Sequence, residues 1–599
     1  MIIFDKQSEF FRYPQGAIRE NSKITLNIYV KRDFVCTPKV IIEKRHDYNK
    51  QFYKSFLFEW TGTEKNYDLY RCEFTIKEYG NYYYSFEFGN KQNPYPATHE
   101  LLIYKNDYNT PLWIKGGIIY HIFVDRFYKI KTNSKKDNIN VRNDWGNVPN
   151  YLPDENGKIL NNDFFGGNID GIISKLPYLQ SLGVTAIYLS PIFEAHSNHK
   201  YDVGDYFNID PMFGDENSLK SLCTESEKYG MAIILDAVLN HSGDDSVYFN
   251  KYNNYKSIGA YQSKESPYLN WYTFNNWNDD YDCWWNIKIL PTLNKENKSY
   301  KNFILGSSGV LKYWLKAGIK GYRLDVADEL PNEFLDELRN SVKTSDSNAL
   351  IIGEVWEDAA NKYSYDKLKE YFCGNQLDSV TNYPLRTAII EYIKNKDCNS
   401  LYETMNAITE KYPPQAINCL MNILSTHDTV RIITELGSSH VPENKNKMAQ
   451  SKLSNDEFIK AIKLLKIASL LQMTMPGVPC IYYGDEAGME GWKDPFNRGC
   501  FPWENENQEI LNHYKFLSKL RKSSNLFVNG KYKCLVHDMG VFVFERYNEN
   551  QKIVIGINLS HNPITLNFHE NMSEFDSTTV GNKFKIWPEK YLILCTNLI

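Results

Sequence analysis

Hydrophobic and polar residues alternate with a period of two along the first 110 residues, as expected for strands with one buried face. The clearest runs are 24–30, 70–76 and 82–88, and turns containing Gly or Asn separate them. Short strands at regular spacing predict an N-terminal β-sandwich domain over residues 1–110.

The pattern changes near residue 113 to short apolar runs separated by amphipathic helical segments. Apolar strands that are buried on both faces and separated by helices favour a parallel α/β sheet. Seven such runs, with an eighth at 376–380, predict a (β/α)8 TIM barrel over residues 111–524. The seven runs are 117–124, 184–189, 231–238, 319–326, 350–355, 419–424 and 478–483.

Two further regions interrupt or follow the predicted barrel. Residues 242–300 are polar, aromatic and poor in helical pattern, and they are too many for an ordinary loop after a strand. We therefore expect an insertion domain after the third barrel strand. After a helix near 509–521, strand patterns return and predict a C-terminal β-sandwich domain over residues 525–599.

Composition narrows the kind of partner. The net charge of −5 gives no basic excess, so we expect no nucleic-acid partner. No apolar run approaches the ~18–20 residues of a membrane span, and the first ten residues lack the apolar core of a signal peptide. The 11 cysteines include no CxxC pair, which favours reduced thiols. These features predict a cytoplasmic protein without a membrane partner.

Polar side chains follow several predicted strands at the point where each strand ends. In a barrel of this kind the carboxyl ends of the strands form the active site, and a polar residue in the middle of a strand would be costly. A single aspartate after a strand is more often a cap or a surface ion pair, but four such coincidences in order indicate one site. The residues are Asp236, Asn240, His241, Arg323, Asp325, Glu354, His427 and Asp428.

The segments around these residues carry a family resemblance. DAVLNH, GYRLDVADE, GEVW and LSTHD look like the four catalytic regions of the α-amylase superfamily, glycoside hydrolase family 13. LPTLN at 290–294 is similar to the fifth region of the neopullulanase, cyclomaltodextrinase and maltogenic amylase subgroup. The resemblance covers about 113–521, and YHIFVDRF, FFGGNIDGI, NHKYDVGDYFNIDPMFG and MPGVPCIYYGDEAGMEG support it.

The resemblance implies cleavage of α-glucosidic bonds by double displacement, with retention of configuration. Asp325 would be the nucleophile, with Arg323 favouring its ionised form. Glu354 would be the general acid and then the base, and Asp428 would bind sugar hydroxyls and favour the distorted ring of the transition state.

Other residues are expected around the reacting sugar. Histidines would donate hydrogen bonds to hydroxyls, Tyr201 would offer a stacking face, and Asp236 and Asn240 would brace the site. For Trp284, Trp285 and Trp356, packing inside the insertion domain is an equal alternative to lining the sites past the cleavage point. Asp494 and Arg498 are interpreted as a structural ion pair in preference to part of the substrate rim. The expected substrate-binding set is His199, Tyr201, Asp202, Asp236, Asn240, His241, Trp285, Arg323, Trp356 and His427.

No cofactor is expected to take part in the chemistry. Members of the resembled subgroup often carry a structural calcium ion near the first barrel loop. In this chain the loop at 129–146 is rich in lysine, and Asn168 replaces the aspartate usual after the paired glycines, both of which weaken a calcium site. A structural calcium ion, where bound, is expected in the region of Asn168 and Asp170.

We therefore expect a retaining α-glucan hydrolase that cleaves α-1,4 bonds in cyclodextrins, pullulan or maltooligosaccharides, with some transglycosylation. Glu357 after GEVW and LPTLN in place of MPKLN depart from the subgroup and leave the preferred substrate open. One alternative is an α-1,6 debranching or mainly glucan-transferring enzyme. An inactive carbohydrate-binding scaffold is disfavoured because all three catalytic carboxylates are present. In the resembled subgroup the N-terminal domain often covers a second subunit, so a homodimer through residues 1–110 is a further expectation.

Overall fold

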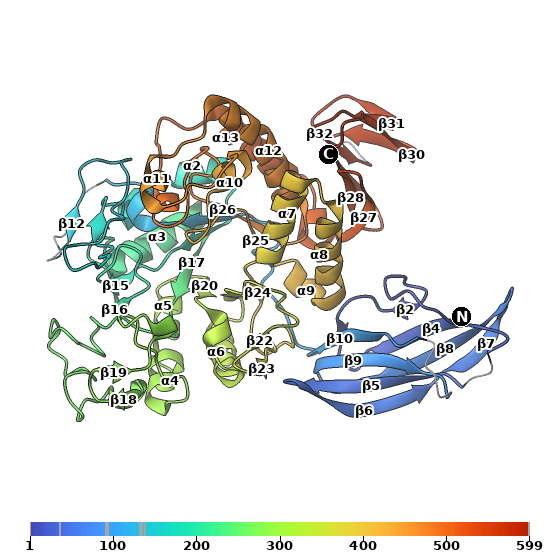
Figure 1. Cartoon of the computed structure of the whole chain (residues 1–599), viewed down its shortest axis with the longest axis horizontal. Coiled ribbons are helices and arrows are strands. Elements are labelled where there is room, and N and C mark those ends of the chain that lie inside the picture. Colours follow the sequence, from blue (N-terminus) through green and yellow to red (C-terminus); the bar gives the residue numbers. More distant parts are fainter. Residues whose placement is uncertain (1, 35–36, 90–94, 131–135, 137–138, 597–599) are drawn as a thin grey trace. The chain divides into compact units, whose positions relative to one another are not determined.

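The computed structural model describes residues 2–34, 37–89, 95–130, 136 and 139–596. They divide into two compact units, which Figure 1 shows in sequence colours. The first unit consists of Met1–Thr110, Trp356–Asp378 and Glu403–Ile417. The second unit consists of Pro111–Val355, Ser379–Tyr402 and Asn418–Ile599. The domain boundaries expected from the sequence stay predictions.

The first unit contains two sheets, coloured blue in Figure 1. In one, β4 (Lys23–Lys31) pairs with β8 (Tyr67–Thr75) in antiparallel register. In the other, β9 (Gly80–Glu87) lies between β5 (Lys39–His46) and β10 (Thr98–Tyr104). Alternate side chains from both sheets meet in one buried core, because a period of two places them all on one face of each strand. The expected N-terminal β domain is confirmed.

Segments from much later in the chain complete this first unit. The ring of Tyr48 stacks on that of Tyr363, with centroids 4.8 Å apart. The Arg12 guanidinium forms a buried ion pair with Glu410. The unit is therefore built from residues that the sequence pattern assigns to different domains.

The second unit contains the predicted barrel. Eight parallel strands pair in the order β24-β21-β20-β17-β14-β11-β26-β25, in which the first strand along the chain, β11, also pairs with the last, β26. A single bridge between Thr381 and Met421 joins the two ends of this order and nearly closes the barrel. The strands are β11 (Ile119–Ile122), β14 (Ala186–Leu189), β17 (Ala232–Ala237), β20 (Gly321–Leu324), β21 (Leu350–Gly353), β24 (Ser379–Val380), β25 (Met421–Ile423) and β26 (Val478–Tyr482).

Burial explains the apolar runs of the barrel strands. Residues such as Ile119, Ile234 and Val478 are inaccessible to solvent and belong to one core cluster inside the barrel. Helices lie between successive barrel strands except β21 and β24, which residues 354–378 connect without an α-helix. The longest, α12 (Asn455–Thr474), begins with a capping box between Ser454 and Glu457. Across the described residues, no helix is both long and apolar enough to cross a membrane.

The insertion predicted after the third barrel strand is irregular and aromatic. Its short hairpin pairs β18 (Phe274–Asn276) with β19 (Asp280–Tyr281). The Phe249 ring packs edge-on against those of Tyr272 and Tyr281, at 4.8 Å in each case. A backbone bridge between His241 and Thr292 returns the insertion to the end of β17.

The C-terminal region forms one six-stranded sheet with the order β27-β28-β29-β32-β30-β31, in which β27 is Lys531–Asp538 and β30 is Ile564–Glu574. Strand β29 (Lys552–Asn558) pairs along its full length with β28 (Val541–Tyr547). Residues 583–594 have a strand pattern in the sequence, but a turn with Glu589 at φ 56° divides them between β31 (Val580–Ile586) and β32 (Lys590–Cys595). The expected C-terminal β domain is confirmed, with its own buried core.

Candidate active site

The barrel brings the predicted carboxylates to one rim. Asp236 lies near the end of β17, Asp325 follows β20 directly, and Glu354 follows β21 directly. Asp428 comes five residues after β25. Because all of these strands are parallel and adjacent or nearly so, their carboxyl ends open on the same face of the barrel.

One guanidinium organises three of these carboxylates. Nη1 of Arg323 lies 3.0 Å from each oxygen of Asp236 and 2.9 Å from Oδ1 of Asp325. Nη2 of the same residue lies 2.9 Å from Oε1 of Glu354. All four side chains are at least 90% buried. The planar fork of arginine, with its several donors, is the group that can hold carboxylates in this way.

The excess of negative charge has a consequence for protonation. Burial raises the pKa of Asp325 well above the usual aspartate range, and the neighbouring Glu354 raises that pKa further, whereas Arg323 lowers it. The sequence indicated only the influence of Arg323. Because three carboxylates share one guanidinium, their charges interact, and Glu354 and Asp236 both raise the pKa of Asp325.

The backbone beside the cluster is strained. Val326 has φ 39° and ψ 56°, in the left-handed region that β-branched residues avoid. In this conformation its N–H donates to Oε2 of Glu354 at 2.9 Å. Both oxygens of Glu354 are therefore held, one by Arg323 and one by the backbone.

Asp428 is the fourth carboxylate of the group and follows β25, which stands at the other end of the strand order. One of its oxygens lies 3.1 Å from Nε2 of His427, and the other accepts from Nη2 of Arg498 at 3.4 Å. Burial and Glu354 raise the pKa of Asp428 to about 7, while Arg498 lowers it. The side chain is one-third exposed, so it remains open to a ligand.

Arg498 has a larger role than the sequence indicated. Its ion pair with Asp494 is present at 2.8 Å. In addition, its Nε donates to the carbonyl of His427 at 2.9 Å and its Nη2 reaches Asp428. Arg498 thus also contacts the candidate site, whereas the sequence favours a structural ion pair alone.

Tyr201 lies inside the cluster. Its hydroxyl donates to Oδ2 of Asp236 at 2.9 Å and lies 2.6 Å from Nε2 of His427. Its ring stacks on that of His427 with 10° between the planes. Tyr188, which sequence reasoning missed, also donates to Asp236, at 2.5 Å. As a residue within strand β14 it carries no motif signal of its own.

Two histidine nitrogens are buried without a hydrogen-bond partner within the described part of the chain. They are Nε2 of His241 and Nδ1 of His427. Burial lowers the pKa of His241 to about 3 and that of His427 well below its usual value, so both rings are neutral at neutral pH. Buried polar atoms are rarely left unpaired in a protein, so these nitrogens are candidates to bond a ligand.

Three other predicted residues form hydrogen bonds with residues around the site. Asp202 accepts from the backbone N–H of Ser197 at 3.0 Å and from its hydroxyl, which closes the loop that carries Tyr201. Nδ1 of His199 accepts the backbone N–H of Tyr201 at 3.2 Å. Oδ1 of Asn240 accepts from Nζ of Lys295 at 2.7 Å.

The tryptophans differ in position. The Trp284 ring stacks on His241 at 5.3 Å and on Trp285 at 5.0 Å, which extends the site outward by two rings. Trp285 is 74% exposed and has a left-handed φ of 50°. Trp356 is half exposed and groups with the first unit.

The expected calcium position was tested against the donors present. Oδ1 of Asn168 accepts the N–H of Gly171 at 2.8 Å and so caps the helix α1 (Ile169–Ser174) that contains Asp170. Among the described residues, no group of three or more His, Cys, Asp and Glu side chains is arranged to hold a metal ion. Residues 131–135 and 137–138 of the lysine-rich loop lie outside the described residues. Calcium binding stays a prediction.

The chain is similar to known proteins over most of its length. The family model for the α-amylase catalytic domain matches residues 121–523. An amylopullulanase of Thermoanaerobacterium saccharolyticum is 34% identical over 97% of this chain and 49% of its own length. A cyclomaltodextrinase of Thermoanaerobacter pseudethanolicus is 32% identical over 86% of this chain and 80% of its own length.

A solved structure extends the similarity to three dimensions. The type III pullulan hydrolase from Thermococcus kodakarensis superposes with a TM-score of 0.70 at 25% identity, over 99% of this chain and 100% of that one. The chain spans between 32% and 49% of the length of the amylopullulanases that it matches.

Proposed function

Because this chain belongs to the α-amylase family of glycoside hydrolases, we propose that it hydrolyses α-1,4-glucosidic bonds in cyclodextrins, pullulan or maltooligosaccharides. The observation that carries the proposal is the single guanidinium of Arg323 shared by Asp325 and Glu354. The names of the relatives, cyclomaltodextrinase and pullulan hydrolase, support the substrate class.

The proposed reaction proceeds with retention, in two steps. First, a carboxylate oxygen of Asp325 attacks the anomeric carbon as the glycosidic C–O bond breaks and the proton of Glu354 moves to the leaving oxygen. Then water attacks the same carbon, its proton passes to Glu354, and the ester bond to Asp325 breaks. Retaining enzymes hold their two carboxyl groups about 5–5.5 Å apart, and a shared guanidinium is a direct way of keeping two carboxyl groups close.

The remaining residues would bind and orient the sugar. Asp428 and the unpaired nitrogens of His241 and His427 can bond hydroxyls of the sugar being cleaved. The exposed Trp285 would receive the leaving part of the glucan on its face. Transglycosylation would follow when a sugar hydroxyl replaces water in the second step.

A decisive test uses two conservative substitutions. Asp325→Asn removes the nucleophile and Glu354→Gln removes the transferable proton, so each should reduce kcat on β-cyclodextrin at least about 10³-fold. Circular dichroism and thermal melting should show that both variants fold as wild type does. Substantial activity in either purified variant contradicts the assigned roles, and the proton NMR of the first anomer released distinguishes retention from inversion.

Digestion of pullulan separates the two candidate specificities. Panose as the product indicates α-1,4 cleavage, as proposed, whereas maltotriose indicates α-1,6 cleavage. The similarity to amylopullulanases is the reason for keeping α-1,6 cleavage as the second candidate. With a maltooligosaccharide as the substrate, products longer than that substrate would indicate glucan transfer.

A further inference from the structure

A second pocket lies in the same unit as the carboxylates. It has a volume of about 670 Å³, within the ~300–1,000 Å³ range of ligand pockets. Its walls come from the loop after β11, from helix α11 (Lys445–Gln450) with the residues that follow it, and from the loop after β26. All of these segments follow the carboxyl ends of barrel strands, so the pocket opens on the face that carries the carboxylates. None of the predicted catalytic residues lines it.

Three indole rings line this pocket, which we call the indole pocket: those of Trp145, Trp492 and Trp503. The Trp145 N–H donates to the carbonyl of Phe501 at 3.1 Å, and the Trp503 N–H donates to the carbonyl of Phe127 at 2.6 Å. Both N–H groups are therefore satisfied inside the protein, and both rings are held in place without a ligand. Rings fixed in advance lose little conformational entropy when a ligand stacks on them.

The polar lining of the indole pocket favours an uncharged ligand. Its ionisable side chains are one lysine, Lys452, and one glutamate, Glu490, whose charges balance. The other polar side chains are amides and a hydroxyl, namely Asn147, Ser451, Asn505 and Asn507. A pyranose ring has apolar C–H faces and hydroxyl edges, so it matches apolar rings surrounded by neutral donors and acceptors.

The indole pocket shares a wall with the candidate active site. Phe496 and Gly499 line the pocket, and Arg498, the neighbour of Gly499 in the chain, reaches Asp428 at 3.4 Å. Consecutive Cα atoms are only ~3.8 Å apart, so one short segment contributes both to the contact with Asp428 and to the lining of the pocket.

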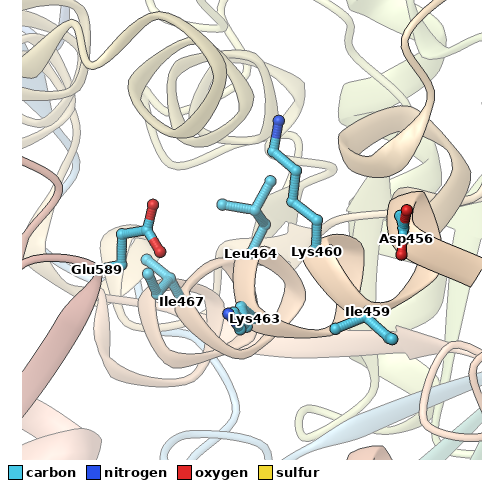
Figure 2. Close-up of a pocket in the computed structure, with 7 residues that line it drawn as sticks. All are labelled: Asp456, Ile459, Lys460, Lys463, Leu464, Ile467 and Glu589. Atoms are coloured by element: carbon cyan, nitrogen blue, oxygen red, sulfur yellow. The ribbon is translucent and has the colours of Figure 1, made fainter.

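A second hollow in the same unit lacks these features. It measures about 240 Å³ and lies between helix α12 and the turn before β32, as Figure 2 shows. Its lining contains Lys460, Lys463, Asp456 and Glu589 but no aromatic ring. Charge without a stacking face does not match a neutral sugar, so the indole pocket is distinguished by its chemistry and not by mere concavity.

We infer that the indole pocket binds a stretch of α-glucan beyond the sugar that is cleaved, and so selects longer chains over short ones. The ligand class rests on the proposed function. The pocket thereby adds a determinant of chain-length preference that lies outside the carboxylate cluster.

The test measures binding apart from turnover. In a Glu354→Gln background, isothermal titration calorimetry gives Kd for maltotriose and for maltoheptaose, with and without Trp145→Ala. We expect Trp145→Ala to weaken maltoheptaose binding about 5- to 10-fold, the effect of one lost ring contact, and maltotriose binding less than twofold. Trp145→Phe keeps an aromatic face and should restore most of the affinity. Trp587→Ala removes a tryptophan of the C-terminal sheet that is 57% exposed and serves as the matched control.

Two outcomes overturn the inference. Equal maltoheptaose affinity in Trp145→Ala and Trp587→Ala means that the pocket holds no glucan. An equal loss for both ligands, with a lowered Tm, means that Trp145 only supports the fold. Failure of the proposed function would look different. If wild type hydrolysed no α-glucan but still bound maltoheptaose in a way that required Trp145, the proposed activity would be refuted and glucan binding in the indole pocket would stand.

Discussion

At the scale of single residues, one arginine decides the geometry of the candidate site. Arg323 contacts three carboxylates that arrive from three different strands, and it is almost wholly buried with them. A buried charge cluster of this kind is stable only while its partners are present, because an unpaired buried charge costs several kcal/mol. The same contact that stabilises the cluster therefore orients it.

Arg323→Lys tests this dependence. A lysine keeps the positive charge but offers one compact ammonium, which cannot replace the fork that reaches Asp325 and Glu354 at once. We expect kcat on β-cyclodextrin to fall at least about 10²-fold and stability to fall by ~3–5 kcal/mol. Arg71→Lys, at a half-exposed arginine of β8, is the control and should change neither quantity. Near-normal kcat in Arg323→Lys would show that the charge alone suffices.

At the scale of elements, a buried carboxyl ties three of them together behind the site. Glu486, in the loop after β26, accepts from the hydroxyls of Tyr120 in β11 and Tyr178 in α2 (Leu176–Ser181), at 2.6 and 2.8 Å. Burial raises the pKa of Glu486 to about 7, while the two tyrosine hydrogen bonds lower it. The loop that lines the indole pocket is thus anchored through an ionisable group.

This group predicts a pH dependence of stability. A folded-state pKa near 7 lies above the unfolded value near 4.5, so the folded state holds the proton more tightly. The resulting stability is fully present below about pH 4.5 and is lost as the pH rises to about 7, in total ~3 kcal/mol. Glu486→Gln cannot ionise, so its stability relative to wild type should increase over this range and then level off.

Urea unfolding between pH 4.5 and 8 measures the difference between the two proteins. The altered hydrogen bonds of Glu486→Gln change the free energy of unfolding by the same amount at every pH. They therefore do not affect the slope of the stability difference against pH, which is what the prediction concerns. The exposed Glu504→Gln should show no change of slope and is the control. A wild-type minus variant difference that is flat across pH 5–7 would contradict the prediction.

At the scale of the whole molecule, the first unit bears exposed large side chains that its core does not use. Phe52 on β6 (Asn49–Leu57) is 61% exposed and Trp60 on β7 (Glu59–Glu64) is 60% exposed. Exposed aromatic side chains are enriched at contacts between subunits. We therefore propose that the first unit mediates a homodimer.

Light scattering at several protein concentrations tests the dimer. Wild type should show twice the chain mass of 70.0 kDa, and the double variant Phe52→Glu/Trp60→Glu should shift toward the monomer. Trp587→Glu, at an equally exposed tryptophan of the C-terminal sheet, should stay dimeric. A wild-type monomer at all concentrations would refute the proposal.

The barrel, the two flanking β domains and the candidate catalytic residues could be predicted from local sequence patterns. Burial on both faces of a parallel strand leaves a run of apolar residues, so seven barrel strands could be located from local pattern. The eighth, at 376–380, contains Gln376, Asp378 and Ser379 and follows from the count that a closed barrel requires. Asp325 and Glu354 could be found because each lies at the end of such a run, where a charged residue has access to a cavity.

Only the tertiary structure decided which of these groups meet. Several contacts join residues that are far apart in the chain. They are the ion pair of Arg498 with Asp428, the hydrogen bond from Tyr188 to Asp236, the stacking of Tyr48 on Tyr363 and the assembly of the indole pocket from three segments. Local periodicity reports how deeply a residue is buried and on which face, but not the partner that it reaches. That partner is set by barrel closure and loop packing, which depend on the free energy of the whole fold rather than on any one segment.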